Sequence, residues 1–212
     1  MIHQVLPVGP LQCNCQLVAC PRTKEAVLVD PGDEPEKILA LVAKAGVTVK
    51  YLLHTHAHFD HCGATGAVKT ATGALTCLHG EDRMLYENLP TQGRMFGMTF
   101  APAPALDKTL ADNEPVTFGD CKLEVIHTPG HSPGSVCFRF SSPESDSEWL
   151  ASGDTLFQGS VGRADLWGGN GRLLVSSIRE RLFVLDDDLP VFPGHGADTR
   201  IGIEKRTNPF LQ

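Results

Sequence analysis

Apolar runs separated by Gly, Pro and Asn predict a chain of short strands and amphipathic helices. In the first quarter, β-rich runs predict strands at residues 2–8, 15–20, 25–30 and 47–53. Residues 35–46 have helical spacing instead, because their apolar side chains recur at i, i+3, i+4 and i+7, at Ile38, Leu41, Val42 and Ala45. Gly46 is a suitable stop for this helix.

The rest of the chain continues this alternation after a loop-rich, proline-containing stretch at 99–115. The pattern predicts a hairpin turned at Gly119-Asp120, two strands joined by a polar loop at 141–147, and a later helix. The expected elements are strands 114–118, 122–127, 135–140, 148–152 and 190–192, a helix at 173–184 and a helical turn at 199–206. Two similar α/β halves in one domain spanning 1–212 are the expected organisation.

Composition excludes several classes of function. With 42% hydrophobic residues, the 212-residue chain can bury a full core. Its net charge is −7, and the basic residues form no stripe that would neutralise phosphates, so we expect no nucleic-acid partner. No run approaches the roughly 20 apolar residues of a membrane span, and the N-terminus has no signal-peptide pattern. We expect a cytoplasmic protein, monomeric or a small homo-oligomer, whose partner is a small molecule.

The seven cysteines are an odd number, which favours free thiols in a reducing compartment. Cys13, Cys15 and Cys20 suggest a thiolate metal site, but they form no C-x-x-C pair and lie in or beside a predicted strand. Small buried hydrophobic residues are the favoured interpretation. Cys62, beside His61, is expected to fill space near a site rather than to bind a metal.

The strongest chemical signal follows the predicted strand 47–53. Residues 54–61 read HTHAHFDH and contain the pattern H-x-H-x-D-H at His56, His58, Asp60 and His61. Imidazole nitrogen and carboxylate oxygen suit zinc and other first-row metals. A turn at a strand end lets the first two histidines converge on one ion while Asp60 and His61 reach another. The motif therefore predicts a metal site with two ions.

Two ions need further donors, and three candidates lie where predicted strands run into loops rich in Gly and Pro. Glycine lets the backbone turn sharply, so that the side chain beside it faces a cleft rather than a core. The three candidates are His131, Asp154 and His195.

Together these residues resemble the metallo-β-lactamase superfamily, whose five motifs occur here in order: Asp30 at a strand end, the H-x-H-x-D-H loop, His131, Asp154 and His195. Residues 153–157, 162–163 and 193–195 resemble its glyoxalase II-like hydrolases. Residues 12–15, 29–32, 94–97, 161–165 and 208–211 resemble the short bacterial YcbL-type subfamily. The resemblance implies an α/β fold, a four-layer αβ/βα sandwich of two mixed sheets flanked by helices, with the metals at one edge.

The resemblance also implies a role for each residue. One metal is bound by His56, His58 and His131, and the other by Asp60, His61 and His195. Asp154 bridges the two, so Asp60 and Asp154 are the catalytic carboxylates. Asp30 orients a ligating imidazole. The ions are expected to be zinc, with iron or manganese also compatible.

Arg163 lies where glyoxalase II has a basic residue that contacts a glutathione carboxylate. The resemblance therefore implies substrate binding by Arg163. A structural bond to a loop carbonyl or to Asp165 is the competing interpretation.

This site predicts hydrolysis of small thioesters of the S-lactoylglutathione type. Two ions sharing a carboxylate give a bridging hydroxide at neutral pH that attacks the thioester carbonyl. A thiolate from a thiol of pKa about 8.5 leaves without a general acid. Only 17 residues follow His195, whereas glyoxalase II has a helical extension that contacts glutathione, so other thioesters or a small ester are alternatives.

Two other activities on the same fold stay open. A persulfide dioxygenase would use one iron held by His56, His131 and Asp154. A lactonase or β-lactamase on the same scaffold is the other, although an amide leaving group needs an acid that the sequence does not supply.

The other four histidines are not expected to bind metal. His54 and His127 are interpreted as buried or hydrogen-bonded side chains, and His3 and His79 as surface or partly buried ones.

Overall fold

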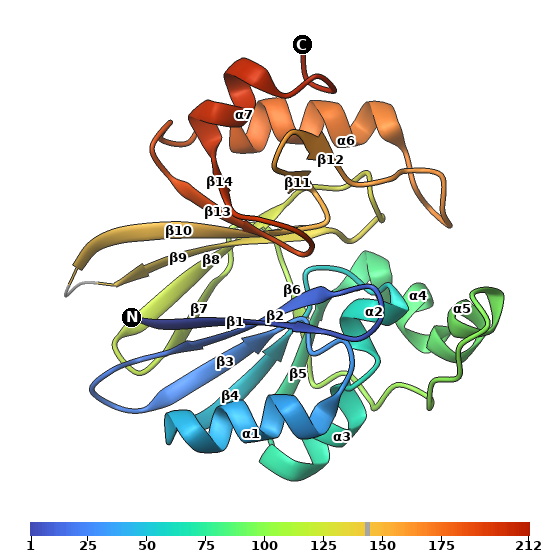
Figure 1. Cartoon of the computed structure of the whole chain (residues 1–212), viewed down its shortest axis with the longest axis vertical. Coiled ribbons are helices and arrows are strands. Elements are labelled where there is room, and N and C mark those ends of the chain that lie inside the picture. Colours follow the sequence, from blue (N-terminus) through green and yellow to red (C-terminus); the bar gives the residue numbers. More distant parts are fainter. Residues whose placement is uncertain (143–144) are drawn as a thin grey trace.

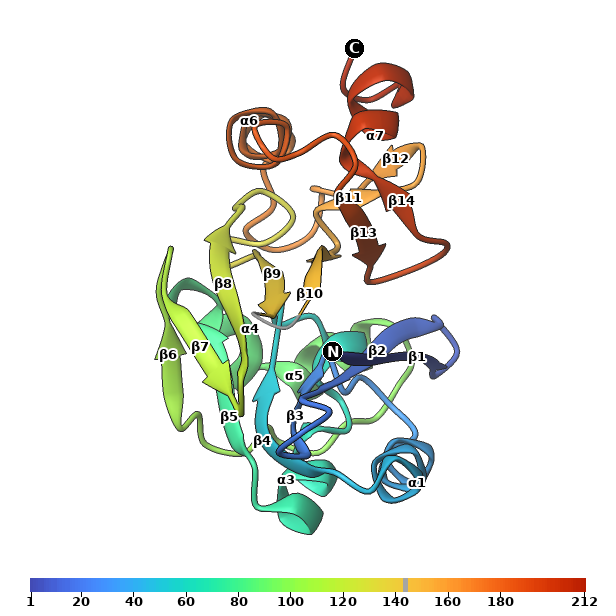
Figure 2. The ribbon, with the colours of Figure 1, turned by 90° about the vertical axis from the view of Figure 1, so that its left-hand side faces the viewer.

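The computed structural model describes residues 1–142 and 145–212. Two six-stranded sheets lie face to face, and helices cover both outer surfaces (Figure 1). The view in Figure 2 shows the same stack from the side, with α1 and α3 against one sheet and α6 and α7 against the other. The four-layer αβ/βα sandwich that the resemblance implied is therefore confirmed.

The first sheet is mixed and has the strand order β1-β2-β3-β4-β5-β6. Its first three strands pair antiparallel, and β3 to β6 pair in parallel. Parallel neighbours need a crossover, which α1 (Pro35–Ala45) and α3 (Thr65–Thr72) supply. The strands are β1 (Ile2–Val8), β2 (Cys13–Ala19), β3 (Glu25–Val29), β4 (Thr48–Leu53), β5 (Leu75–His79) and β6 (Lys108–Leu110).

The second sheet has the order β14-β13-β10-β9-β8-β7 and is antiparallel except where β10 meets β13. Its strands are β7 (Pro115–Phe118), β8 (Cys121–His127), β9 (Val136–Ser142), β10 (Ser145–Gly153), β13 (Pro190–Pro193) and β14 (Thr199–Arg200). A small hairpin, β11 (Leu156–Phe157) with β12 (Ser160–Val161), lies outside it. The helices on its outer face are α6 (Gly171–Ser177), its π-helical continuation η2 (Ile178–Leu182) and α7 (Ile201–Thr207).

Alternating side chains bind the layers together. In β2, Val18 faces the interior between the sheets, while Leu17 faces α1 and packs with Ile38. The interior is aromatic on the second sheet, where Trp149 stacks on Phe140 with ring centroids 4.2 Å apart. Both faces of each sheet are thus apolar, which explains the nearly continuous apolar runs of the inner strands.

Several expected boundaries were wrong. The polar loop predicted at 141–147 is shorter, because β9 continues to Ser142 and β10 begins at Ser145; residues 143–144 lie outside the described residues. The predicted loop 99–115 contains β6, which is only three residues long and exists through its pairing with β5. The sequence patterns also gave no sign of β5, α4 (Arg83–Glu87) or α5 (Leu89–Met95).

Within the described part of the chain, the helices are all too short or too polar to cross a lipid bilayer.

Candidate metal centre

Every predicted metal donor lies just beyond the carboxyl end of a strand or in the short helix that follows. These ends meet at one edge of the sandwich, beside α2 (Phe59–Cys62) in Figure 1. His56 and His58 follow β4, and Asp60 and His61 lie in α2. The second sheet supplies the others: His131 after β8, Asp154 after β10 and His195 after β13.

Two glycines let these loops approach one another. A Cβ atom on Gly194 would lie 2.3 Å from Asp154 Oδ1 and 2.7 Å from His61 Cε1, closer than any side chain tolerates. Gly153 has φ +49°, a left-handed conformation that glycine adopts without strain. The glycine residues next to Asp154 and His195 are therefore required by packing at the site.

The first donor group is formed by three buried imidazoles. His131 Nε2 lies 3.1 Å from His56 Nε2 and 2.8 Å from His58 Nδ1. The rings of His56 and His58 are nearly perpendicular to that of His131. Three nitrogens thus converge on one point from three directions.

The second group contains Asp60, His61 and His195. His61 Nε2 and His195 Nε2 are 3.1 Å apart, and Asp60 Oδ2 lies 3.2 Å from His195 Nε2. Asp154 lies between the two groups: its Oδ1 is 3.3 Å from His61 Nε2, and its Oδ2 is 3.6 Å from His131 Nε2. The structure therefore brings all seven predicted donors together, with Asp154 between the group of His56, His58 and His131 and the group of Asp60, His61 and His195.

In four of the five histidines, the ring nitrogen that faces away from the donor groups has a hydrogen-bond partner. Asp30 Oδ2 lies 3.0 Å from His61 Nδ1, and Thr55 donates its hydroxyl to the same carboxylate oxygen while its Oγ1 lies 3.0 Å from His56 Nδ1. Backbone carbonyls hold the two histidines of the second sheet: His131 Nδ1 donates to Arg163 O, and His195 Nδ1 donates to Leu11 O. These bonds fix the tautomers that leave the inner nitrogens as lone-pair donors. Asp30 is thus placed to orient His61, as the resemblance implied.

The charge states match metal binding. Burial, with His131 nearby, lowers the pKa of His58 to about 3, so this imidazole is neutral at pH 7. Burial alone would raise the pKa of Asp154, but His61, His131 and His195 hold it well below its usual range. His56 and His58 are thus neutral and Asp154 is ionised, which are forms that bind a divalent cation. Nearby carboxylates, Asp60 and Asp154 among them, raise the pKa of His61 and His195, so a cation binding there would displace a proton.

The residues fit two divalent ions. A tetrahedral zinc with bonds of about 2.0–2.1 Å to nitrogen places two ligand atoms roughly 3.3 Å apart, close to the nitrogen separations in both groups. Asp154 Oδ1 is buried and has no hydrogen-bond partner among the described residues. A bound cation would supply the missing partner. His58 Nε2, the nitrogen turned away from His131, also has no partner in that part of the chain.

Asp82, at the end of the turn η1 (Gly80–Asp82), is a supporting residue that the sequence patterns did not reveal. Its fully buried carboxylate accepts hydrogen bonds from the Ala57 and Gly134 amides and from the Ser132 hydroxyl. Burial raises the pKa of Asp82, and the three bonds oppose that rise. Asp82 therefore joins the loop of His56 and His58 to the loop of His131.

Asp82→Ala is expected to lower the free energy of unfolding by about 3 kcal/mol, because two amides and a hydroxyl lose their acceptor. Metal affinity should fall by roughly 10- to 100-fold, as for other residues that support ligands. Denaturant unfolding and competitive chelator titration measure the two effects. Glu87→Ala is the matched control, since Glu87 is an exposed acid on α4 whose carboxylate lies near Arg83. Equal stability and affinity in both variants would contradict this role.

The remaining candidates lie outside the two groups. His54 is fully buried against Cys62 and Thr65, and burial lowers its pKa to about 4. His127 stacks on His79 and contacts Pro133 O, as expected for hydrogen-bonded or partly buried histidines. Cys13 is a buried strand residue whose Sγ lies 3.5 Å from His61 Nδ1, on the side away from the donors.

An open cleft of about 360 Å³ leads to the centre. Asp60, Asp154, His131 and His195 lie in its wall, and among the described residues that line it Arg163 is the only Lys or Arg. The Arg163 side chain is exposed and forms two hydrogen bonds with Asp165, at 2.7 and 2.9 Å. The guanidinium thus lines the cleft with a carboxylate partner already in place.

Comparisons with known proteins agree with this geometry. The model of the metallo-beta-lactamase superfamily matches residues 8–195. Hydroxyacylglutathione hydrolase GloC of Haemophilus influenzae is 37% identical, over 98% of this chain and 97% of its own. The structure of TTHA1623 in a di-iron-bound form is 42% identical with a TM-score of 0.87, covering 98% of this chain and 100% of that one. The BLEG-1 B3 metallo-beta-lactamase structure is 38% identical with a TM-score of 0.89, covering 99% of each chain. The chain therefore belongs to the metallo-beta-lactamase superfamily and to its glyoxalase II-like branch.

Proposed function

We propose that this protein is a two-metal hydrolase of small thioesters of the S-lactoylglutathione type. The observation that carries the proposal is the pair of donor groups sharing Asp154 at the base of an open cleft. Two ions held there would lower the pKa of a water and polarise the substrate carbonyl. Zinc is the proposed ion, although the di-iron-bound relative makes iron the first alternative to test.

The chain's own residues favour a thioester over an amide. All the titratable side chains in the described cleft wall are proposed metal ligands, apart from Arg163. No acid is therefore left to protonate a leaving group. A thiolate needs none, because its thiol has a pKa of about 8.5, whereas an amine leaving from a β-lactam does. The similarity to GloC supports the same choice.

The imidazoles proposed as metal ligands also have little conformational freedom. Asp30, Thr55 and the carbonyls of Arg163 and Leu11 hold four of the five imidazoles in fixed orientations. Rigid donors keep the reacting geometry without reorganisation during the reaction, which is the main protein contribution in such sites.

Metal analysis coupled to turnover tests the proposal. We expect two metal ions per chain and hydrolysis of S-lactoylglutathione, with no oxygen uptake on glutathione persulfide and little turnover of a β-lactam or lactone. One iron per chain with oxygen consumption would replace the proposal with a persulfide dioxygenase. β-Lactam hydrolysis in preference to the thioester would favour the activity named for BLEG-1.

Arg163→Ala is expected to raise KM for S-lactoylglutathione by less than about threefold, because the guanidinium is exposed and already paired with Asp165. Asp165→Asn removes this competing carboxylate, so KM for the same anionic substrate should fall. Initial-rate kinetics over a range of substrate concentrations measure both. An unchanged KM in both variants would exclude substrate binding by Arg163 and leave only its carbonyl, which orients His131.

A further inference from the structure

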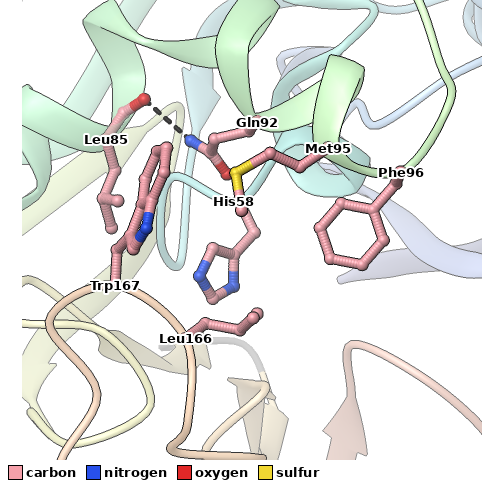
Figure 3. A pocket seen from close by; sticks show the side chains of 7 residues that line it. All are labelled: His58, Leu85, Gln92, Met95, Phe96, Leu166 and Trp167. Carbon is pink, nitrogen blue, oxygen red and sulfur yellow. Dashed lines mark hydrogen bonds between the residues drawn. The ribbon is translucent and has the colours of Figure 1, made fainter.

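A second, apolar hollow opens beside the metal cleft. It is small and shares His58, Gln92, Phe96 and Leu166 with the cleft, so the two spaces adjoin. Figure 3 shows Trp167 and Phe96 on opposite sides of the His58 imidazole, with Met95 and Leu166 on the other two. A molecule reacting at the metal centre can therefore extend into this hollow.

The walls of the hollow come from two separate segments. Leu85, Met95 and Phe96 belong to α4, α5 and the residue after it, and Leu166 and Trp167 belong to the loop between β12 and α6. None of these side chains is charged. Gln92 is buried, and its amide nitrogen donates to Ala57 O and Leu85 O. The hollow thus has an apolar lining on a wall fixed by hydrogen bonds.

Three large apolar side chains are exposed at its rim. Met95, Phe96 and Trp167 are 61%, 48% and 42% exposed. Large apolar side chains gathered at one exposed place indicate a binding site, because each would be more stable away from water. Their position next to the metal cleft makes the substrate the natural occupant.

The chemistry of the substrate decides which part enters. Carrier thiols such as glutathione bear amides and charges close to the sulfur, and moving these groups against an apolar wall would remove their hydration. The acyl chain is the apolar part of such a molecule. Resting on the proposed function, we propose that the hollow formed by Leu85, Met95, Phe96, Leu166 and Trp167 binds the acyl chain, so that the preferred substrates are thioesters of short apolar acids such as butyrate.

A series of thioesters sharing one thiol, N-acetylcysteamine, tests this. We expect kcat/KM to rise about fourfold for each added methylene (about 0.8 kcal/mol), or about fifteenfold from acetyl to butyryl. Trp167→Ala should reduce this ratio to less than about threefold, because it removes one wall. Met84→Ala is the control: Met84 is 62% exposed, lies on α4 and does not line the hollow, so the ratio should stay near fifteen. A ratio near one in the unaltered enzyme would overturn the proposal.

A binding measurement separates this proposal from the proposed function. Trp167 is one of two tryptophans, and the other, Trp149, is buried against Phe140. Titration with acetate, butyrate and hexanoate should change the Trp167 emission at concentrations that fall with chain length, and Trp167→Phe should abolish the change. Chain-length-dependent binding without any thioester hydrolysis would refute the proposed function and support the hollow. Hydrolysis of all the thioesters at equal rates, with equal binding of the three acids, would support the proposed function and refute binding of the acyl chain in the hollow.

Discussion

Asp154→Ala is expected to lower kcat/KM for S-lactoylglutathione by roughly a thousandfold while leaving the fold intact. Asp154 is the one donor within reach of both groups, with oxygens 3.3 Å from His61 Nε2 and 3.7 Å from His195 Nε2 as well as 3.6 Å from His131 Nε2. Its loss would remove the ligand that the two proposed ions would share. Metal assistance contributes several kcal/mol to such reactions, and each 1.36 kcal/mol is tenfold in rate, which gives about three orders of magnitude.

The metal content and the fold of this variant must be measured together with its kinetics. We expect fewer than two ions per chain and an unchanged circular dichroism spectrum, since the Asp154 carboxylate lies in the cleft wall and its ion pairs are with other donors of the centre. Asp198→Ala is the matched control, because Asp198 is an exposed carboxylate three residues after His195 that lines no part of the cleft. Substantial turnover by Asp154→Ala with two bound ions would contradict the bridging role.

The donors of this centre were accessible from the sequence because they obey a local rule. His56, His58, Asp60 and His61 lie within six residues after a β-branched run, and His131, Asp154 and His195 each follow a strand beside glycine. A strand end is recognisable from its neighbours alone. The convergence of these ends then follows from the fold that the motifs imply.

The supporting residues were not accessible, because nothing local marks them. Asp82 ends a helical turn and has the appearance of an ordinary surface acid in the sequence. It nevertheless joins the loop of Ala57 to the loop of Ser132, which lies 50 residues after Asp82, and belongs to neither. The carbonyls of Leu11 and Arg163 orient His195 and His131, and a backbone carbonyl leaves no trace in residue type. Arg163 was chosen for its side chain, whereas its carbonyl makes the contact with the centre.

The sequence patterns missed one strand and two helices for the same reason. β6 is three residues long, and its pairing with β5 depends on a parallel neighbour brought alongside by the fold. α4 and α5 pack around Leu85 and Leu89 against α2, so their apolar positions are arranged for this one contact and not as a regular amphipathic face. These are also the helices that form one wall of the apolar hollow. The part of the chain that sets substrate preference was therefore the part least visible in the sequence.

Removal of the bound metal is expected to lower the melting temperature by roughly 10 °C. Without cations, His131 Nε2 is held 2.8 Å from His58 Nδ1 and 3.1 Å from His56 Nε2, and the carboxylates of Asp60 and Asp154 both lie close to His61. A ligand present at a thousand times its Kd stabilises the native state by about 4 kcal/mol. For a chain of 150–250 residues each kcal/mol corresponds to about 2–4 °C.

Calorimetry of chelator-dialysed protein, before and after reconstitution with zinc, iron or manganese, measures this shift. Zinc should restore the full difference if tetrahedral nitrogen-rich sites are its preferred geometry, and iron or manganese should restore it only where they also restore thioester turnover. Asp154→Ala should show a smaller shift than the unaltered protein, because it has less bound metal to lose. Identical melting curves for the dialysed and reconstituted protein would mean that the seven donors are held together by the fold alone, and the function proposed from their convergence would lose its basis.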